Sequence, residues 1–160
     1  MPCPSRPRRG IPPETGRPHM KRWGLLLLRV TMGWLLVLWG IDKLQNVAHA
    51  QAVAETYYFG IGAHFVVQQI FGVLEIMLGA MVILGRHRRR LYPVMLFVLL
   101  FTAVGVWRSI IDPWGWFLDG SNALFYPSAI IAAGALLLWG MIDEDELALD
   151  TIMMPAGRTR

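Results

Sequence analysis

The chain has 160 residues, of which 55% are hydrophobic, and it carries a formal net charge of +4. Its length suits one domain and its apolar content is high for a soluble one, so the composition favours an integral membrane protein. The only cysteine, Cys3, has no partner for a disulfide or a CxxC motif, which excludes thiol–disulfide chemistry by this chain alone. The basic residues gather outside the apolar stretches, as they do when they set membrane orientation, so we expect no nucleic-acid partner.

Residues 1–21 are rich in Pro, Arg and Gly, and we expect them to form a flexible, basic cytoplasmic tail. The first apolar span, Trp23 to Ile41, lacks a following small-residue cleavage site and is therefore expected to stay in the protein. Helical spacing places Arg29 and Lys43 on one face of this helix, with Gly33, Leu36 and Gly40 between them.

Residues 45–63 join the first two spans and contain an aromatic group, Tyr57, Tyr58 and Phe59. Tyrosine rings favour the membrane–water boundary, so we expect a short interfacial helix here. The histidines and acids of this segment lack the i, i+4 spacing of a helical metal site, and we expect no metal centre.

The second span, Phe65 to Leu84, has about the 20 apolar residues that a membrane-crossing helix needs. Glu75 lies near its midpoint, where a carboxylate is costly unless it faces protein or water. Gln68 and Glu75 share one helical face with Gly72 and Gly79, and thin glycine faces allow another helix to approach closely. We expect this face to point into a helix bundle.

Arg29 is the candidate counter-charge for Glu75, since the expected depths of the two residues differ by roughly 6 Å. Side chains lean toward the N-terminus of their own helix, which moves these two apart in antiparallel neighbours. The alternative is that Arg29 extends to the cytoplasmic interface. The sequence predicts an intramembrane polar cluster of Arg29, Gln68 and Glu75, with Glu75 open between a structural and a functional role.

The loop after the second span reads GRHRRR and is predicted to be cytoplasmic by the positive-inside rule, in agreement with the basic N-terminal tail. Its arginines are candidates for contact with anionic lipid headgroups: Arg86, Arg88, Arg89 and Arg90.

The third span, Leu91 to Ile111, ends at an aromatic loop on the outer side. Arg108 and Asp112 are spaced to form an ion pair. An aromatic belt explains the loop, and the alternative is an apolar surface for a partner subunit or a lipid-soluble ligand. The predicted outer-face charged and aromatic site consists of Lys43, Arg108, Asp112, Trp114 and Trp116.

The fourth span covers residues 122–142, with Ser121 or Asp119 as the expected N-cap. Ala129 and Ala133 repeat at small-xxx-small spacing, as do Ser128 and Ala132, which favours tight helix packing. The acidic residues 143–146 end the span, and residues 148–160 are expected to be a short cytoplasmic tail. We predict an all-α, four-transmembrane-helix bundle over residues 22–147.

The first span reads R-x3-G-x6-G-x2-K from Arg29 to Lys43, and the second reads G-x2-E-x3-G from Gly72 to Gly79. This pattern resembles the DoxX-like family of small four-helix bacterial membrane proteins. The resemblance implies a protein of the bacterial cytoplasmic membrane that is found beside redox or quinone-linked enzymes, and one branch supplies a subunit of a thiosulfate:quinone oxidoreductase. The positive-inside rule together with four spans predicts that both termini are cytoplasmic.

The residues show no nucleotide loop, no paired catalytic carboxylates and no histidine inside a span for haem, so we expect no catalytic residue and no cofactor of the chain's own. The predicted function is a non-catalytic accessory subunit, embedded in the bilayer and docked on larger membrane subunits of a redox-linked complex. The alternative is a subunit of a quinone-linked oxidoreductase in which Arg29 and Glu75 line a quinone or proton path.

Overall fold

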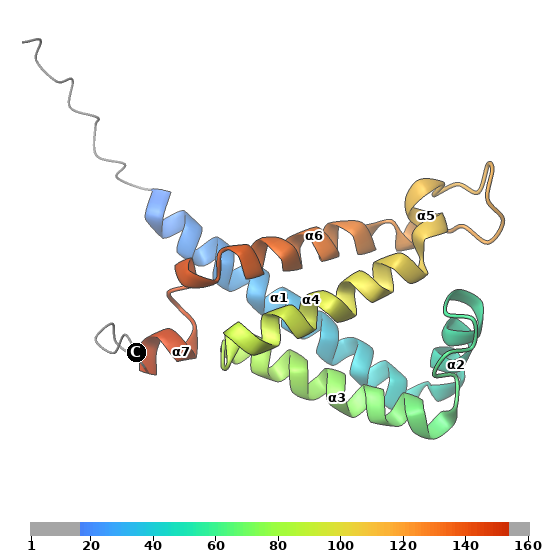
Figure 1. Ribbon diagram of the computed structural model, residues 1–160, viewed down its shortest axis with the longest axis horizontal. Helices are drawn as coiled ribbons and strands as arrows, with labels where there is room; N and C mark the ends of the chain where they lie inside the picture. Colours follow the sequence, from blue (N-terminus) through green and yellow to red (C-terminus); the bar gives the residue numbers. More distant parts are fainter. Residues whose placement is uncertain (1–16, 154–160) are drawn as a thin grey trace, which may run out of the picture.

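The computed structural model describes residues 17–153, and over this range it contains helices and no strands, which confirms the all-α class (Figure 1). The helices are α1 (Arg17–Gln45), α2 (Val47–Tyr57), α3 (Phe65–Leu84), α4 (Arg88–Gly105), α5 (Trp107–Ile111), α6 (Pro127–Gly140) and α7 (Leu149–Met153), with short 3-10 turns η1 (Ala123–Phe125) and η2 (Ile142–Glu144). The predicted flexible tail lies outside the described residues up to position 16, and α1 already begins at Arg17.

Among the described residues, three helical stretches are long and apolar enough to cross a membrane: His19–Gln45, Phe65–Leu84 and Ala123–Gly140. Helix α4 has 18 residues but begins with three arginines, which shortens its apolar part. Large apolar side chains are exposed along these helices, as expected where a helix faces lipid; they include Leu27, Trp34, Leu74, Phe97 and Ile130. The chain is therefore an integral membrane protein.

Glycines bring α1 and α3 into close backbone contact. A Cβ atom added at Gly33 would lie 2.7 Å from the carbonyl oxygen of Gly79, and one added at Gly40 would lie 2.5 Å from that of Gly72. Only residues without side chains allow this approach, which is the use of small residues expected in membrane helices. The predicted inward glycine face of the second span is thus the contact face with α1.

Helices α4 and α6 form the second close pair (Figure 1). On α6 the small residues Ser128, Ala132 and Ala135 are buried, so this helix packs through one of the two small-residue faces predicted from the sequence. The apolar core lies between the two pairs and contains Leu36, Val82, Tyr92, Met95, Leu99 and Leu138, each with at most 1% of its surface exposed.

The predicted third and fourth spans differ from the helices at their outer ends. Helix α4 stops at Gly105, where the ring of Tyr58 packs against the backbone, and α5 continues the segment separately. Neither Ser121 nor Asp119 caps α6: the side chain of Asn122 accepts a hydrogen bond from the backbone of Leu124 and so caps the 3-10 turn η1. Helix α6 starts at Pro127, whose fixed φ suits a first helical position.

The molecule has two ends of different character. Figure 1 shows the start of α1, the α3–α4 loop and α7 at one end, and α2 and α5 at the other. We call the first the basic end, because it holds Lys21, Arg22 and the arginines of residues 86–90, and the second the α2 end. The described parts nearest to both termini lie at the basic end.

Candidate functional site

A buried polar network closes the basic end. Arg29 Nη1 donates to both carboxylate oxygens of Asp145 at 2.9 Å, and Tyr92 Oη donates to Asp145 Oδ2 at 2.7 Å. The side chains of Arg29 and Asp145 are only 3% and 0% exposed. A buried ion pair of this kind is stable only when further hydrogen bonds accompany it. Here the Tyr92 hydroxyl supplies one to Asp145, and Arg29 Nη2 donates a second to the carbonyl of Leu147 at 3.0 Å.

The segment after α6 is held to the α3–α4 loop by its backbone. Arg88 Nη1 donates to the carbonyl oxygens of Ile142 and Asp145 at 2.8 and 2.6 Å, and the backbone N–H of Asp150 donates to Gly85 at 3.2 Å. Gly85 has a positive φ of 68°, and a Cβ there would meet Ala148 and Arg29 Nη1 at 2.7 and 2.9 Å. The residues just past the acidic run, expected as the start of a tail, therefore pack against the bundle.

The predicted pairing of Arg29 with Glu75 is wrong. Gly33 opposes Gly79 on the antiparallel α3, so Glu75 lies level with Val37 of α1. From that level Lys43 is six residues away, about 9 Å, whereas Arg29 is eight residues away, about 12 Å. Side chains lean toward their helix N-terminus, which brings Lys43 and Glu75 together and moves Arg29 away.

Glu75 instead pairs with Lys43 inside the bundle. Lys43 Nζ donates to Glu75 Oε2 at 2.8 Å, and the two side chains are 24% and 14% exposed. The charge that the sequence places at mid-membrane depth thus has its counter-charge on the neighbouring helix. The pair satisfies the physical requirement that an intramembrane carboxylate face protein rather than lipid.

The Lys43–Glu75 pair lines a cavity of 210 Å³ at the α2 end. Gln68 lines it too, and its Nε2 donates to the carbonyl of Gly62 at 2.9 Å, whereas its buried Oε1 has no partner among the described residues. Other lining residues are apolar or hydroxylic: Trp39, Ala50, Val53, Ala54, Tyr58, Thr102, Val106, Phe125 and Ser128. Of the predicted cluster, the fold brings Gln68 and Glu75 to one cavity and leaves Arg29 outside it.

Two exposed groups, Asp42 and His49, also line this cavity. His49 Nδ1 lies 2.9 Å from Asp42 Oδ2, and the two side chains are 66% and 39% exposed. Exposure decreases from this pair to Lys43 and then to Glu75. Among the charged groups that line the cavity, Asp42 and His49 are thus the most exposed and Glu75 is the most buried.

The predicted outer-face site is divided in the structure. Lys43 lies in the cavity, and Arg108 does not pair with Asp112 but places its guanidinium 5.8 Å from the ring of Trp107. Asp112 accepts backbone N–H groups of the loop that follows it, Trp116, Phe117 and Leu118, at 2.6 to 3.0 Å. Because these backbone N–H groups already satisfy the Asp112 carboxylate, it needs no ion pair with Arg108.

The hydrogen bond from Phe117, followed by those from Trp116, Leu118 and Gly115, lowers the pKa of Asp112 from its ordinary value of 3.8. The loop it holds presents Trp114 and Trp116, stacked with ring centroids 5.4 Å apart. These rings and Phe117 are 71%, 74% and 87% exposed. The result is an ordered aromatic loop, residues 113–118, beyond the apolar helices.

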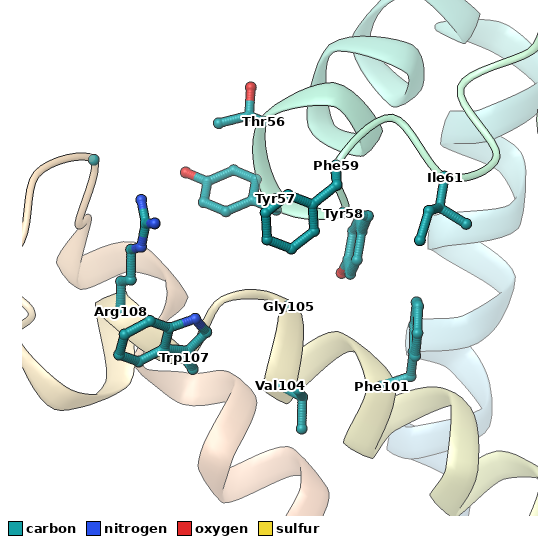
Figure 2. A pocket seen from close by; sticks show the side chains of 11 residues that line it. Thr56, Tyr57, Tyr58, Phe59, Ile61, Phe101, Val104, Gly105, Trp107 and Arg108 are labelled. Carbon is teal, nitrogen blue, oxygen red and sulfur yellow. The ribbon is translucent and has the colours of Figure 1, made fainter.

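A second cavity, of 470 Å³, lies at the same end. Figure 2 shows Tyr57, Tyr58 and Phe59 on one side of it and Phe101, Val104 and Trp107 on the other, with Arg108 at its rim. Its walls are aromatic and aliphatic, and Arg108 is the one basic side chain among its lining residues. It does not share the Lys43–Glu75 pair.

The four loop arginines have different environments. Arg88 is bound within the protein, and Arg89 Nη2 lies 3.3 Å from Asp143 at the surface. Arg86 and Arg90 are exposed. Contact of Arg86, Arg89 and Arg90 with lipid headgroups stays a prediction, and Arg88 has its donors directed to backbone carbonyls instead.

Sequence reasoning missed Asp145 as the partner of Arg29 and Tyr92 as a second donor to Asp145. The signal was present: Arg29 lies within two helical turns of the basic end, and the acidic run 143–146 follows the last span, which returns the chain to that end. A buried guanidinium requires an acceptor, and this run supplies the nearest carboxylates.

A comparison with family models matches the DoxX family over residues 24–108, more than half of the chain. The match includes α1 from Gly24 onward, all of α3, and the residues of the Lys43–Glu75 cavity up to Val106. Comparisons with curated proteins and with solved structures gave no match. The family match and the apolar helices together identify the chain as an integral membrane protein that belongs to the DoxX family.

Proposed function

We propose that this protein is a non-catalytic accessory subunit that docks on larger subunits of a redox-linked complex in the bacterial cytoplasmic membrane. In this proposal α4 is the fourth membrane-spanning helix, beside the three with clear membrane-spanning character, and both termini are cytoplasmic. Basic residues lie in the first two turns of α1 and at the start of α4, and the two spans between them, α1 and α3, agree with a cytoplasmic position for both. The redox link rests on the resemblance to the family.

The observation that carries the docking role is the aromatic loop 113–118. Its three large rings are exposed beyond the apolar helices, and Asp112 holds their backbone in one conformation. Exposed aromatic side chains on an ordered segment lose little conformational freedom when a partner covers them, which is why such residues dominate protein interfaces.

The test is extraction of the tagged full chain from its native membrane in mild detergent. We expect a larger membrane enzyme to co-purify with the wild type, and to be lost when Trp114, Trp116 and Phe117 are all replaced by Ser. Leu124→Ser is the matched control, because Leu124 is 83% exposed at the same end but outside the loop. Equal recovery with the triple variant would contradict the docking role.

The second candidate is a quinone-linked oxidoreductase subunit, and the cavity around Lys43 and Glu75 favours it. Arg29 has no part in this version because it belongs to the network at the basic end. The lining fits a quinol head: Gln68 Oε1 is an unpaired acceptor, Lys43 is a donor and the walls are largely apolar. When bound, such a ligand would supply electron transfer, while Lys43, Gln68 and Glu75 would orient its head and hold a proton.

One substitution separates the two candidates. Glu75→Gln keeps the size of the side chain but removes its charge and its ability to take up a proton. If the turnover of the co-purified enzyme is unchanged in this variant, the accessory role is supported. If turnover falls while the complex stays assembled, the second candidate is supported.

A further inference from the structure

The buried Arg29–Asp145 network and the partly buried Lys43–Glu75 pair lie at different levels of the bundle and are separated by apolar core. On α1, Met32 and Leu36 lie between Arg29 and Lys43; on α4, Met95 and Leu99 lie between Tyr92 and Thr102. These four core residues are at most 7% exposed. Arg29 and Lys43 are 14 residues apart, which is about 21 Å along a helix. Water has no polar path between the clusters through such a layer.

The titratable side chains that line the cavity come from three helices and one turn. Asp42 and Lys43 face it from α1, His49 from α2, Tyr58 from the turn after α2, and Glu75 from α3. Helices α4 and α6 contribute Thr102 and Ser128, which do not titrate near neutral pH. The titratable groups thus form a sequence from the exposed His49 to the most buried group, Glu75.

We propose that Glu75 exchanges protons with the aqueous phase on the α2 side only, through the mouth formed by Asp42 and His49, and that the apolar core seals it from the basic end. Uptake of one proton at Glu75 Oε2 breaks the ion pair with Lys43 and leaves the ammonium as the net charge of the site. Release of that proton to the same side restores the pair. The chain is therefore a one-sided proton site rather than a channel. This inference rests on the membrane placement proposed above, and it needs no docking partner.

Cysteine accessibility in sealed vesicles tests the sidedness, with the full chain in a Cys3→Ser background. Ala50→Cys places a thiol in the cavity lining, and Ala135→Cys places one in the apolar core, where Ala135 is 0% exposed. Glu55→Cys and Arg86→Cys mark the two surfaces. With a membrane-impermeant thiol reagent, we expect Ala50→Cys to react from the Glu55 side and Ala135→Cys from neither. Reaction of Ala50→Cys from the Arg86 side, or from neither, would overturn the proposal.

Infrared spectroscopy tests the proton itself. The carbonyl band of protonated Glu75 is identified by its loss in Glu75→Gln. After transfer to D2O this band should shift several-fold more slowly in the double variant Asp42→Asn, His49→Ala than in the wild type. Glu55→Gln is the matched control, since Glu55 is exposed on α2 but does not line the cavity. An unchanged rate in the double variant would contradict the proposal that protons reach Glu75 past Asp42 and His49. Loss of the docking partner would leave both measurements unaffected, so the two proposals fail separately.

Discussion

At the scale of single residues, the two basic side chains on one face of α1 each have a different acid. Arg29 pairs with Asp145 and Lys43 pairs with Glu75. The sequence predicts that Glu75 needs a partner inside the bundle, because a lone carboxylate at that depth is costly. It does not determine which cation approaches, because that depends on the register of α1 against α3, and the glycine contacts fix this register only in the folded protein.

Asp145→Ala should strongly destabilise the protein. The change leaves the Arg29 guanidinium and the Tyr92 hydroxyl buried without their acceptor, and removal of one partner of a buried ion pair costs about 3–5 kcal/mol. Asp143→Ala is the control, because the Asp143 and Arg89 side chains are 78% and 83% exposed, and an exposed pair contributes about 0–1 kcal/mol. The free energy of unfolding in detergent micelles measures both, and equal losses would contradict the burial argument.

The aromatic loop should loosen in acid. The pKa of Asp112 is lower in the folded chain than in the unfolded one, so its carboxylate stabilises the loop above the unfolded value. This contribution is lost as the pH falls through the folded value. Hydrogen exchange of residues 115–118, corrected for intrinsic rates, should show protection that declines below about pH 4. Asp112→Asn should abolish this pH step, and a step that persists in the variant would assign it to another group.

At the scale of helices, the sequence predicts the spans better than their ends. The short helix between the first two spans is confirmed as α2, and α3 has the predicted bounds. The third span breaks after Gly105, where the Tyr58 ring, which comes from a distant turn, packs on the backbone. Such a contact depends on tertiary structure, and periodicity in one segment cannot reveal it.

Gly40→Ala should weaken the α1–α3 contact. The added methyl group would lie 2.5 Å from the carbonyl oxygen of Gly72, so the helices must separate, and overpacking of this kind typically costs about 1–3 kcal/mol. Gly24→Ala on the same helix is the matched control, because among the described residues nothing beyond its chain neighbours and its own helix backbone lies within 4 Å of the added Cβ. Thermal unfolding of both variants in the same detergent makes the comparison. A control as unstable as Gly40→Ala would show that the close approach is not the cause.

At the scale of the whole molecule, the fold places one closed charge network at the basic end and one cavity with a charge pair at the α2 end, with apolar core between them. The all-α class and the inward glycine face follow from the sequence, because they depend on local periodicity. The division of the polar residues into two clusters cannot be predicted from the sequence. It depends on the return of the acidic run 143–146 to the basic end, and on the register of α1 against the antiparallel α3. The separation of the two clusters therefore depends on the pairing of Lys43, rather than Arg29, with Glu75.

A double-mutant cycle tests that pairing most directly. The folded yield and the free energy of unfolding are measured for Lys43→Leu, Glu75→Leu and their combination, and in parallel for Arg29→Leu with Glu75→Leu. We predict that the Lys43 and Glu75 changes are each destabilising alone and that their combination recovers about 0.5–3 kcal/mol relative to additivity, whereas the Arg29 and Glu75 changes simply add. Recovery in the Arg29 combination, with additive losses for Lys43, would contradict the structure of the site.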